Sequence, residues 1–305
     1  MKSKIFLISL LISLPFWFAV NVLADNLENF WYLQEIVRRP GLLTAAADQK
    51  ILAIELKNIR EQKLREERFN NLQLQAEAAT SIEILNDGSE KVLFEKNSEQ
   101  AWPIASLTKL MAALVVFDLD ETYSSSQTIK ITKEAVNQEG SSKFSEIRPG
   151  DTMSVRNLVQ KMLIESDNDA AFALTEPMGE KAFVGLMNIY SKEIGLKDTV
   201  FSNPTGLEQN NSTVRDLARL TEYILEKHPE IFEITTYNVD QNTNELLGEI
   251  PEIIGGKTGW TPEAKGCLLL VLDNPRGGYF INVVLGSEDR FGDMRKIINA
   301  IKSGN

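Results

Sequence analysis

The chain has 305 residues, of which 43% are hydrophobic and 25% are charged, a composition typical of a globular protein with one large domain and additional segments. Its formal net charge of −11 disfavours partners that present phosphates, so we expect no nucleic acid and no anionic lipid surface as a partner. A single cysteine excludes an internal disulfide, and with one histidine beside it the chain is poorly supplied with transition-metal ligands.

The N-terminus carries a hydrophobic segment. Lys2 and Lys4 precede an apolar run over residues 5–24, an arrangement typical of a secretory signal. Small residues near Ala24 offer a cleavage site, but the run is also long enough to span a bilayer of about 30 Å. We therefore expect residues 1–25 to be a signal peptide or a retained membrane anchor, and the rest of the protein to lie outside the cytoplasm.

Residues 26–78 are predicted to link this segment to a folded domain. An aromatic stretch, FWYL, indicates a patch beside the membrane. Residues 45–78 are rich in Ala, Leu, Glu, Lys and Arg, with apolar residues at helical spacing and without Gly or Pro. This segment is interpreted as a charged spacer helix, with a short coiled coil as the alternative.

A globular domain is expected over residues 79–305. It begins with two short strands around Asn86-Asp87-Gly88, a strong hairpin signal, and ends with two strands in KGCLLLVLDNPRGGYFINVVLG and an amphipathic helix. Several helices are predicted between residues 132 and 228. Strands at both ends and helices between them predict an α/β (α+β) fold, in which a mainly antiparallel sheet receives strands from both ends of the domain and a helical subdomain is inserted.

The stretch PIASLTKLM places Ser106 and Lys109 three positions apart in a run that otherwise resembles a buried helix. On a helix these two side chains are neighbours, so an amine is positioned to take a proton from the hydroxyl. By itself the pair also fits an ordinary helix start, with Ser106 as N-cap and Lys109 reaching water. Further motifs are needed to decide between the two interpretations.

Two later stretches supply them. LIESDNDA contains Ser166, Asp167 and Asn168 at the end of a helical run, and GGKTGW contains Lys257, Thr258 and Gly259 before a predicted strand. Ser-x-x-Lys, Ser-Asp-Asn and Lys-Thr-Gly, in this order, are the motifs of serine β-lactamases and penicillin-binding proteins.

From about residue 79 to 303 the sequence resembles the low-molecular-mass penicillin-binding proteins, the serine D-alanyl-D-alanine carboxypeptidase family S11. The resemblance implies a β-lactamase/transpeptidase-like fold and hydrolysis of peptidoglycan stem peptides that end in D-Ala-D-Ala. It also implies inhibition by β-lactam antibiotics and needs no metal or organic cofactor. Membrane attachment would come from the N-terminal segment, since the β-rich C-terminal domain of larger relatives does not appear in this sequence.

The motif residues then receive roles. Ser106 is the predicted nucleophile, because a helix N-terminus favours developing negative charge. Lys109 is expected to be a neutral amine that acts as general base, since the helix dipole, burial and the second cation Lys257 all depress its pKa. If its segment is a turn, Ser166 relays a proton to the leaving D-alanine nitrogen, and Asn168 binds the substrate's peptide carbonyl.

The remaining motif residues are assigned to substrate binding. Lys257 and Thr258 are suited to the terminal carboxylate, and Gly259 permits close approach of the backbone. The resemblance implies an oxyanion hole formed by the backbone N–H groups of Ser106 and Trp260. Asp167 is expected only to cap a helix or face solvent, and the family often has glycine at this position.

Three alternatives stay open. A serine β-lactamase uses the same motifs, but class A enzymes also need a glutamate that activates the deacylating water, for which Glu176 is a weak candidate. A peptidoglycan endopeptidase would differ in the shape of its cleft. A non-catalytic wall-binding protein is disfavoured, because every catalytic motif is intact.

Overall fold

A computed structural model of the chain describes residues 40–119, 121–140, 145–207 and 209–302. Its contacts divide the chain into two compact units, Met1–Leu64 and Arg65–Asn305. The apolar run at residues 5–24, expected to be a signal or an anchor, lies outside the described residues. Within the described ranges, no helix combines the length and the hydropathy needed to cross a bilayer.

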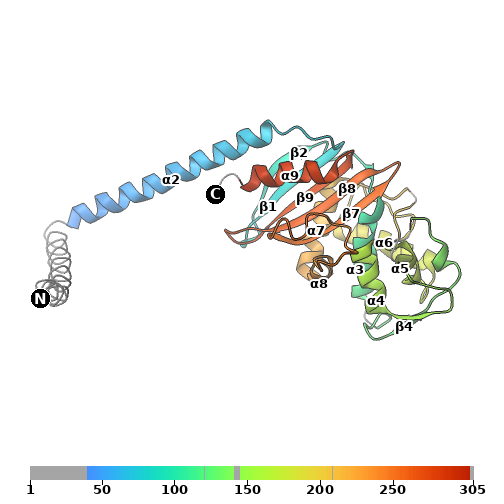
Figure 1. The fold of residues 1–305 in the computed structure, drawn as a ribbon. Coiled ribbons are helices and arrows are strands. Elements are labelled where there is room, and N and C mark those ends of the chain that lie inside the picture. Colours follow the sequence, from blue (N-terminus) through green and yellow to red (C-terminus); the bar gives the residue numbers. More distant parts are fainter. Residues whose placement is uncertain (1–39, 120, 141–144, 208, 303–305) are drawn as a thin grey trace, which may run out of the picture. The chain divides into compact units, whose positions relative to one another are not determined.

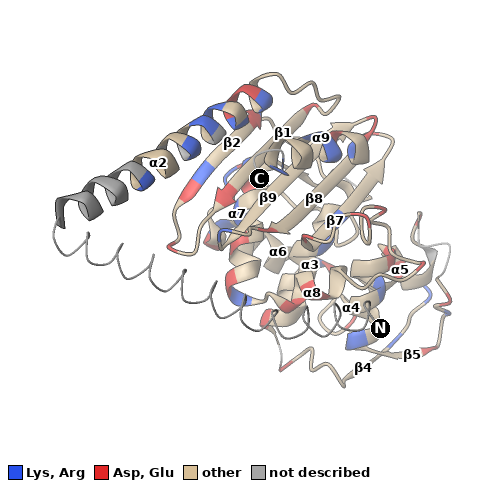
Figure 2. Cartoon of the chain, turned by 60° about the vertical axis from the view of Figure 1, so that its left-hand side comes forward, with Lys and Arg blue, Asp and Glu red and all other residues tan. Residues whose placement is uncertain are grey.

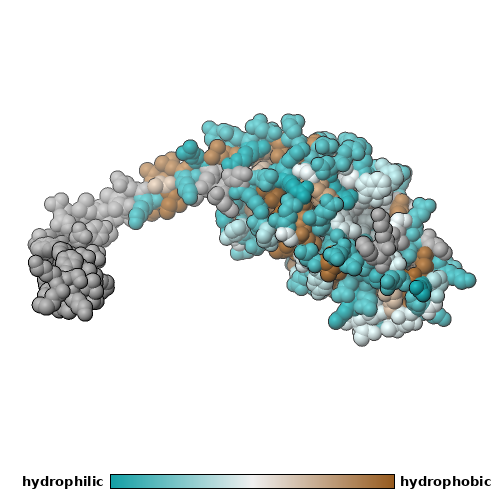
Figure 3. Space-filling view, in the orientation of Figure 1, coloured by the Kyte–Doolittle hydropathy of each residue, from teal (hydrophilic) through white to brown (hydrophobic). Residues whose placement is uncertain are grey.

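The predicted spacer is a helix, α2, which runs over Pro40–Asn70 rather than to residue 78. In the N-terminal unit its aliphatic side chains are exposed, among them Ile51, Leu56 and Ile59, and they form a brown stretch in Figure 3. The helix ends in an asparagine pair, where Asn71 Nδ2 donates to the carbonyl of Glu67 at 2.8 Å and competes with the regular ladder. Residues 65–78, assigned from sequence to the spacer, belong to the C-terminal unit.

The C-terminal unit is built on a five-stranded antiparallel sheet in the order β2-β1-β9-β8-β7 (Figure 1). The predicted hairpin is present as β1, Ala78–Ile84, and β2, Glu90–Lys96. The other three strands are β7, Ile253–Thr261, β8, Lys265–Asp273, and β9, Tyr279–Ser287. Because β1 pairs with β9, both ends of the domain contribute to one sheet, as the sequence predicts.

The central strands β8 and β9 are buried on both faces of the sheet, which explains the continuous apolar run of β8. Leu268 and Leu270 pack in a cluster with residues of α9, Arg290–Lys302, on one face. Cys267 and Leu269 pack on the other face against the helical part of the unit. Figure 2 shows the contrast between strand β8, which has charged residues only at its two ends, and the outer strand β2, which carries Lys and Glu along its length.

The helical part lies between β2 and β7 in the sequence. Its centre is α3, Thr108–Asp118, which is apolar on all sides and buried from Thr108 to Val116. The other elements are β3 (Trp102–Pro103), η1 (Ala105–Leu107), β4 (Thr128–Lys130), η2 (Ala135–Asn137), β5 (Thr152–Ser154), α4 (Val155–Gln160), η3 (Lys161–Glu165), α5 (Asn168–Ala173), α6 (Glu180–Ile194), β6 (Asn211–Ser212), α7 (Val214–Lys227) and α8 (Glu230–Thr235).

Candidate active site

Ser106 lies on a short 3₁₀ turn, η1, that leads into the buried helix α3. The sequence predicted a helix that starts at Ser106, and the structure places the serine just before the α-helical segment. Ala105, the preceding residue, has a φ of 46°, which a residue with a side chain rarely adopts. Such a conformation persists only where neighbouring segments hold it, and two glycines meet the turn here.

Gly206 and Gly259 allow two other segments to pack against this turn. A Cβ at Gly206 would overlap the carbonyl of Ala105, and a Cβ at Gly259 would lie 3.0 Å from the backbone nitrogen of Ser106. Strand β7 therefore runs directly beside the serine backbone because Gly259 has no side chain. This close approach brings the backbone of Trp260, the next residue of β7, to the same side of the site.

Lys109 joins the serine to two other segments. Its Nζ lies 2.9 Å from Oγ of Ser106, 2.6 Å from Oδ1 of Asn168 and 2.7 Å from the carbonyl oxygen of Thr205. The side-chain amide of Asn168 is fixed, because its Nδ2 donates to the carbonyl of Glu139 at 2.6 Å. Two of the three neighbours of Nζ can therefore only accept a hydrogen bond, and the third is a hydroxyl.

This geometry matches a neutral amine, which has two N–H bonds and one lone pair. In the neutral form, the N–H groups reach Asn168 and Thr205 and the lone pair faces the hydroxyl of Ser106, whereas in the protonated form the same nitrogen donates to all three neighbours. Lys109 is fully buried. Burial lowers its pKa to about 7, while the negative charge of Asp167 opposes this shift. The expected depression of the pKa is present, and the opposing carboxylate was not anticipated from the sequence.

Ser166 lies at a bend between two helical segments. It follows the π-helical turn η3 with a φ of 59°, and Asn168 is the first residue of α5. The segment is thus a turn at Ser166 and helix from Asn168 onward. This bend points Ser166 and Asn168 into one cleft, whereas Asp167 is buried and caps α5 by accepting a bond from the backbone of Ala170 at 2.9 Å.

Lys257 links the Lys-Thr-Gly motif to the Ser-Asp-Asn motif. Its Nζ donates to Oγ of Ser166 at 2.8 Å and to the carbonyl of Thr258 at 3.0 Å. Burial, followed by the charges of Lys109 and Arg290, lowers the pKa of Lys257 well below its usual value. A bound carboxylate would oppose this shift, so the site favours an anionic ligand next to Lys257.

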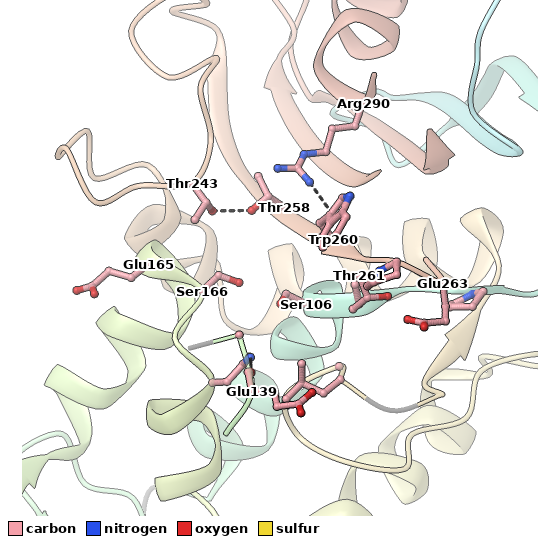
Figure 4. A pocket seen from close by; sticks show the side chains of 18 of the residues that line it. Ser106, Glu139, Glu165, Ser166, Thr243, Thr258, Trp260, Thr261, Glu263 and Arg290 are labelled. Atoms are coloured by element: carbon pink, nitrogen blue, oxygen red, sulfur yellow. Dashed lines mark hydrogen bonds between the residues drawn. The ribbon is translucent and has the colours of Figure 1, made fainter. Parts of the chain in front are cut away.

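All eight residues singled out from the sequence meet at one cleft of about 900 Å³. Six of them line it, namely Ser106, Ser166, Asn168, Thr258, Gly259 and Trp260. Lys109 and Lys257 lie behind this surface and hydrogen-bond to the two serines. Figure 4 shows Ser106 at the centre of the cleft, with Trp260 on the rim, where the indole is 62% exposed.

The structure adds residues that no motif had indicated. Arg290, from α9, lines the cleft and donates to the carbonyl of Gly259 at 2.9 Å, while Oγ1 of Thr243 lies 2.5 Å from Oγ1 of Thr258 (Figure 4). Thr205 supplies the carbonyl that fixes Lys109. The signal available for Thr205 was its place in FSNPTGL, one residue before Gly206, whereas Arg290 and Thr243 stand in no recognisable pattern.

Residues set aside in the sequence analysis lie elsewhere. Cys267 is buried in β8, and burial raises the pKa of its thiol to about 12. His228, the single histidine, is the C-cap residue of α7, and its ring contacts Asp118 at 2.6 Å, away from the residues that line the cleft. Glu176 accepts a hydrogen bond from Thr132 and does not line the cleft, so its candidacy as a water-activating group is wrong.

Three carboxylates do border the cleft, Glu139, Glu165 and Glu263. Glu165 is paired with Lys161 at 3.1 Å, while Glu139 and Glu263 are exposed. Across the described part of the chain, no group of three His, Cys, Asp or Glu side chains is arranged to hold a metal ion.

The match to a known protein family lies within the C-terminal unit. Residues 66–289 match the family model described as D-alanyl-D-alanine carboxypeptidase, peptidase S11. The D-alanyl-D-alanine carboxypeptidase DacF of Bacillus subtilis is 37% identical over 211 residues, which cover 63% of this chain and 54% of that protein. The chain therefore spans about half the length of that relative.

A D-alanyl-D-alanine endopeptidase of Pseudomonas aeruginosa is 34% identical over 254 residues, 76% of this chain and 80% of that protein. Among solved structures, penicillin-binding protein D2 of Listeria monocytogenes in its cefotaxime-bound form superposes with a TM-score of 0.67 at 31% identity. The superposition covers 75% of this chain and 98% of that one.

Proposed function

Because the chain belongs to the D-alanyl-D-alanine carboxypeptidase family of serine peptidases, we propose that it removes the terminal D-alanine from peptidoglycan stem pentapeptides through an acyl-enzyme on Ser106. The observation that carries this proposal is the environment of Lys109. Its buried nitrogen has two acceptors and one hydroxyl as neighbours, so that in the neutral form its two N–H bonds are engaged and its lone pair faces the serine. A lysine with a pKa of about 7 is matched to work as a base at neutral pH.

In the proposed acylation, Lys109 takes the proton of Ser106 while Oγ attacks the carbonyl carbon of the penultimate D-alanine. The tetrahedral oxyanion is assigned to the backbone N–H groups of Ser106 and Trp260, a pairing supported by the close packing of Gly259 against the backbone of Ser106. When the C–N bond breaks, the leaving nitrogen receives a proton through Ser166. Lys257, which donates to Ser166 at 2.8 Å, orients this relay.

The C-terminal carboxylate of the substrate is assigned to Lys257, Thr258 and Arg290. Lys257 is buried and its pKa is lowered, so a bound carboxylate would raise that pKa again. The carboxylate would in turn accept a charge-assisted hydrogen bond from the lysine. Thr258 offers a hydroxyl that already contacts Thr243, and Arg290 adds a guanidinium at the edge of β7. Asn168 is assigned to the peptide carbonyl before the scissile bond. Water then hydrolyses the ester and releases the shortened peptide.

β-Lactams are proposed to acylate the same serine. Penicillin-binding protein D2 of Listeria monocytogenes is known in cefotaxime-bound and ampicillin-bound forms, and it matches this chain at 31% and 32% identity. A penicillin or cephalosporin has a carboxylate on the carbon next to its lactam nitrogen, as the substrate has next to its scissile amide nitrogen. This carboxylate is therefore assigned to the same lysine. We propose peptidoglycan stem peptides as substrate and β-lactams as inhibitors.

Peptidoglycan lies outside the cytoplasmic membrane, so the catalytic domain is proposed to work there. Residues 1–25 are assigned to a signal peptide or an anchor, residues 26–78 to a juxtamembrane segment and spacer helix, and residues 79–305 to the catalytic domain. The exposed aliphatic residues of α2 leave room for self-association of the spacer as a coiled coil.

An endopeptidase that cuts cross-links is the second candidate. Two relatives with this name, from Pseudomonas aeruginosa and Escherichia coli, match 80% and 78% of their own length, more than the carboxypeptidase of Bacillus subtilis does. The bond cleaved is again the one after a D-alanine acyl group, so the same residues would serve. The difference lies in how much of the acceptor peptide the cleft admits.

The experiment that tests the proposal uses the full-length chain in detergent with a D-Ala-D-Ala pentapeptide, a cross-linked muropeptide dimer and benzylpenicillin. We expect release of D-alanine and a covalent penicilloyl adduct seen by intact mass, both absent in Ser106→Ala. Cleavage of the dimer alone would move the assignment to the endopeptidase. Rapid release of hydrolysed penicillin would indicate a β-lactamase, and folded protein without adduct or turnover would overturn catalysis altogether.

A further inference from the structure

Asp167 lies between Ser166 and Asn168 and is completely buried. One carboxylate oxygen, Oδ1, accepts a hydrogen bond from the backbone of Ala170. The other, Oδ2, is shielded from solvent and has no hydrogen-bond partner among the described residues. A buried carboxylate with an unpaired oxygen is costly unless opposite charge lies nearby, so its presence calls for an explanation.

Helix capping does not account for the charge. A cap needs one acceptor oxygen, and hydroxyl or amide side chains serve as well as aspartate. In the same unit, Ser154 caps α4 and Thr213 caps α7 through neutral hydroxyl groups. The negative charge of Asp167 is therefore more than the start of α5 requires.

Asp167 acts on Lys109, which is fully buried, and Lys109 in turn acts on Lys257, which is 2% exposed. Lys109 bonds directly to Asn168, and Lys257 bonds directly to Ser166, so the two lysines meet the two residues that flank Asp167 in the chain. Any proton that the lysine pair keeps in this interior needs a counter-charge.

The other charged groups around the lysines are engaged elsewhere or are themselves positive. These groups are Glu139 after η2, Glu165 in η3, Asp169 in α5 and Arg290 in α9. Glu139 is exposed, Glu165 is paired with Lys161 at 3.1 Å, and Asp169 accepts from the backbone of Gln138 at 3.2 Å. Asp167 is also the carboxylate that raises the pKa of Lys109 against the effect of burial.

We propose that Asp167 is a positioning residue whose negative charge keeps one proton on the buried Lys109–Lys257 pair. The inference rests on the proposed function, since the pair matters only if Ser106 is acylated. With the charge present, the pair keeps one proton for the substrate carboxylate. Without it, the pair loses that proton more easily, so the base is available at lower pH and the carboxylate meets a weaker cation.

The test is Asp167→Asn in the full-length chain. Asparagine has nearly the same shape and keeps an oxygen for the backbone of Ala170, so the substitution removes mainly the charge. The second-order rate constant for acylation of Ser106 by benzylpenicillin is measured from pH 5 to 9. The rate falls at low pH, and this part of the profile is called the acid limb. We expect the midpoint of the acid limb to move to lower pH by on the order of one unit, the lower end of the usual effect of a close opposite charge.

At one pH unit below the wild-type midpoint, the variant should then retain about fivefold more of its own plateau rate than the wild type does. Because the two lysines titrate together, the midpoint is a property of the pair. Loss of the Asp167 charge lowers this midpoint whichever lysine holds the proton. A purely structural cap would lower the melting temperature or the plateau and leave the limb in place.

Asp216→Asn is the matched control. Asp216 is also a buried carboxylate in the first turn of a helix, where it accepts from the backbone of Asp198 and the hydroxyl of Thr199, both at 2.8 Å. Its removal should leave the limb unchanged. An acid limb of Asp167→Asn that coincides with the wild-type limb overturns the inference.

If Asp167→Asn does not fold, Asp167→Ser must show the same downward movement, since a hydroxyl also caps the helix without charge. Absence of acylation in the wild type is a different result, because it refutes the proposed function rather than the role of Asp167.

Discussion

The Nζ of Lys257 donates a hydrogen bond of 2.8 Å to Oγ of Ser166, a residue 91 positions earlier in the chain. This bond holds the start of α5 against strand β7 and orients the serine hydroxyl in the cleft. In the proposed mechanism, the same bond holds the hydroxyl of Ser166 in place for proton relay and gives the buried lysine a hydrogen-bond acceptor.

Ser166→Ala should lower kcat/KM for D-alanine release by about 10²–10⁴, the usual contribution of a positioned proton-transfer group. The loss arises because the leaving nitrogen has no proton donor and Lys257 loses a partner. The measurement is a coupled D-alanine assay with the pentapeptide. Ser126→Ala, an exposed serine that contacts Ser124 at 3.3 Å, is the control and should keep full activity. A Ser166→Ala enzyme as fast as this control would contradict the relay.

Acylation should follow the ionisation of Lys109. Because only the neutral amine accepts a proton, the rate is expected to be half-maximal near pH 7, where the pKa lies, and to fall about tenfold per unit below it. Stopped-flow or quenched acylation by benzylpenicillin at each pH gives the profile. Lys109→Arg, a cation at every accessible pH, should abolish acylation, and measurable adduct in this variant would refute the role of Lys109.

Gly206→Ala should disrupt the turn that carries Ser106. A side chain there would overlap the carbonyl of Ala105, and the residue also has a φ of 88°. We expect the free energy of unfolding to decrease by about 1–3 kcal/mol because of the backbone conformation, and to decrease further because of the overlap. The rate of acylation should fall at least tenfold. Urea denaturation and the acylation rate are the two measurements.

Gly150→Ala separates the two contributions in that experiment. Gly150 has a φ of 94°, but a Cβ at this position would meet no atom within 4 Å. The control carries the cost of the backbone conformation without the overlap, so it should be destabilised while acylation stays normal. Equal effects in the two variants would mean that contact with Ala105 is unimportant.

Arg290→Met should weaken recognition of the substrate's terminal carboxylate. The guanidinium lines the cleft and is fixed by the carbonyl of Gly259 at 2.9 Å. With a free-acid peptide, kcat/KM is expected to fall on the order of tenfold to a hundredfold, as on loss of one partner of a desolvated charge pair. A C-terminally amidated peptide should lose far less. Equal losses on both peptides would assign Arg290 to support of β7 rather than to the carboxylate.

Much of the fold was predictable because its signals are local. The Asn86-Asp87-Gly88 turn, the apolar runs of β8 and β9 and the closing helix each followed from patterns within a few residues. The order of the strands was expected only in outline, since pairing of β1 with β9 joins residues about two hundred positions apart. The helix boundary was missed because apolar spacing continued beyond Asn70, where the asparagine pair ends the ladder.

The residues of the site also fall into two groups, those with a local sequence signal and those without one. Ser106, Lys109, Ser166, Asn168 and the Lys-Thr-Gly stretch were visible because each lies in a short motif whose spacing the chemistry requires. Arg290 and Thr243 belong to segments that only the folded chain brings to the cleft. The buried, half-satisfied state of Asp167 was also beyond the sequence, since a helix cap and a solvent-exposed residue have the same pattern.

The sequence by itself determined the residue types of the reaction, the order of the motifs and the family, because local spacing specifies which groups must act together. Tertiary structure decided the proton affinities. The pKa of Lys109 depends on complete burial and on a carboxylate 58 positions away in the chain, and that of Lys257 depends on burial first and then on Lys109 and Arg290. Electrostatic energies follow distance and exposure to water in three dimensions, and no spacing along the chain encodes either quantity.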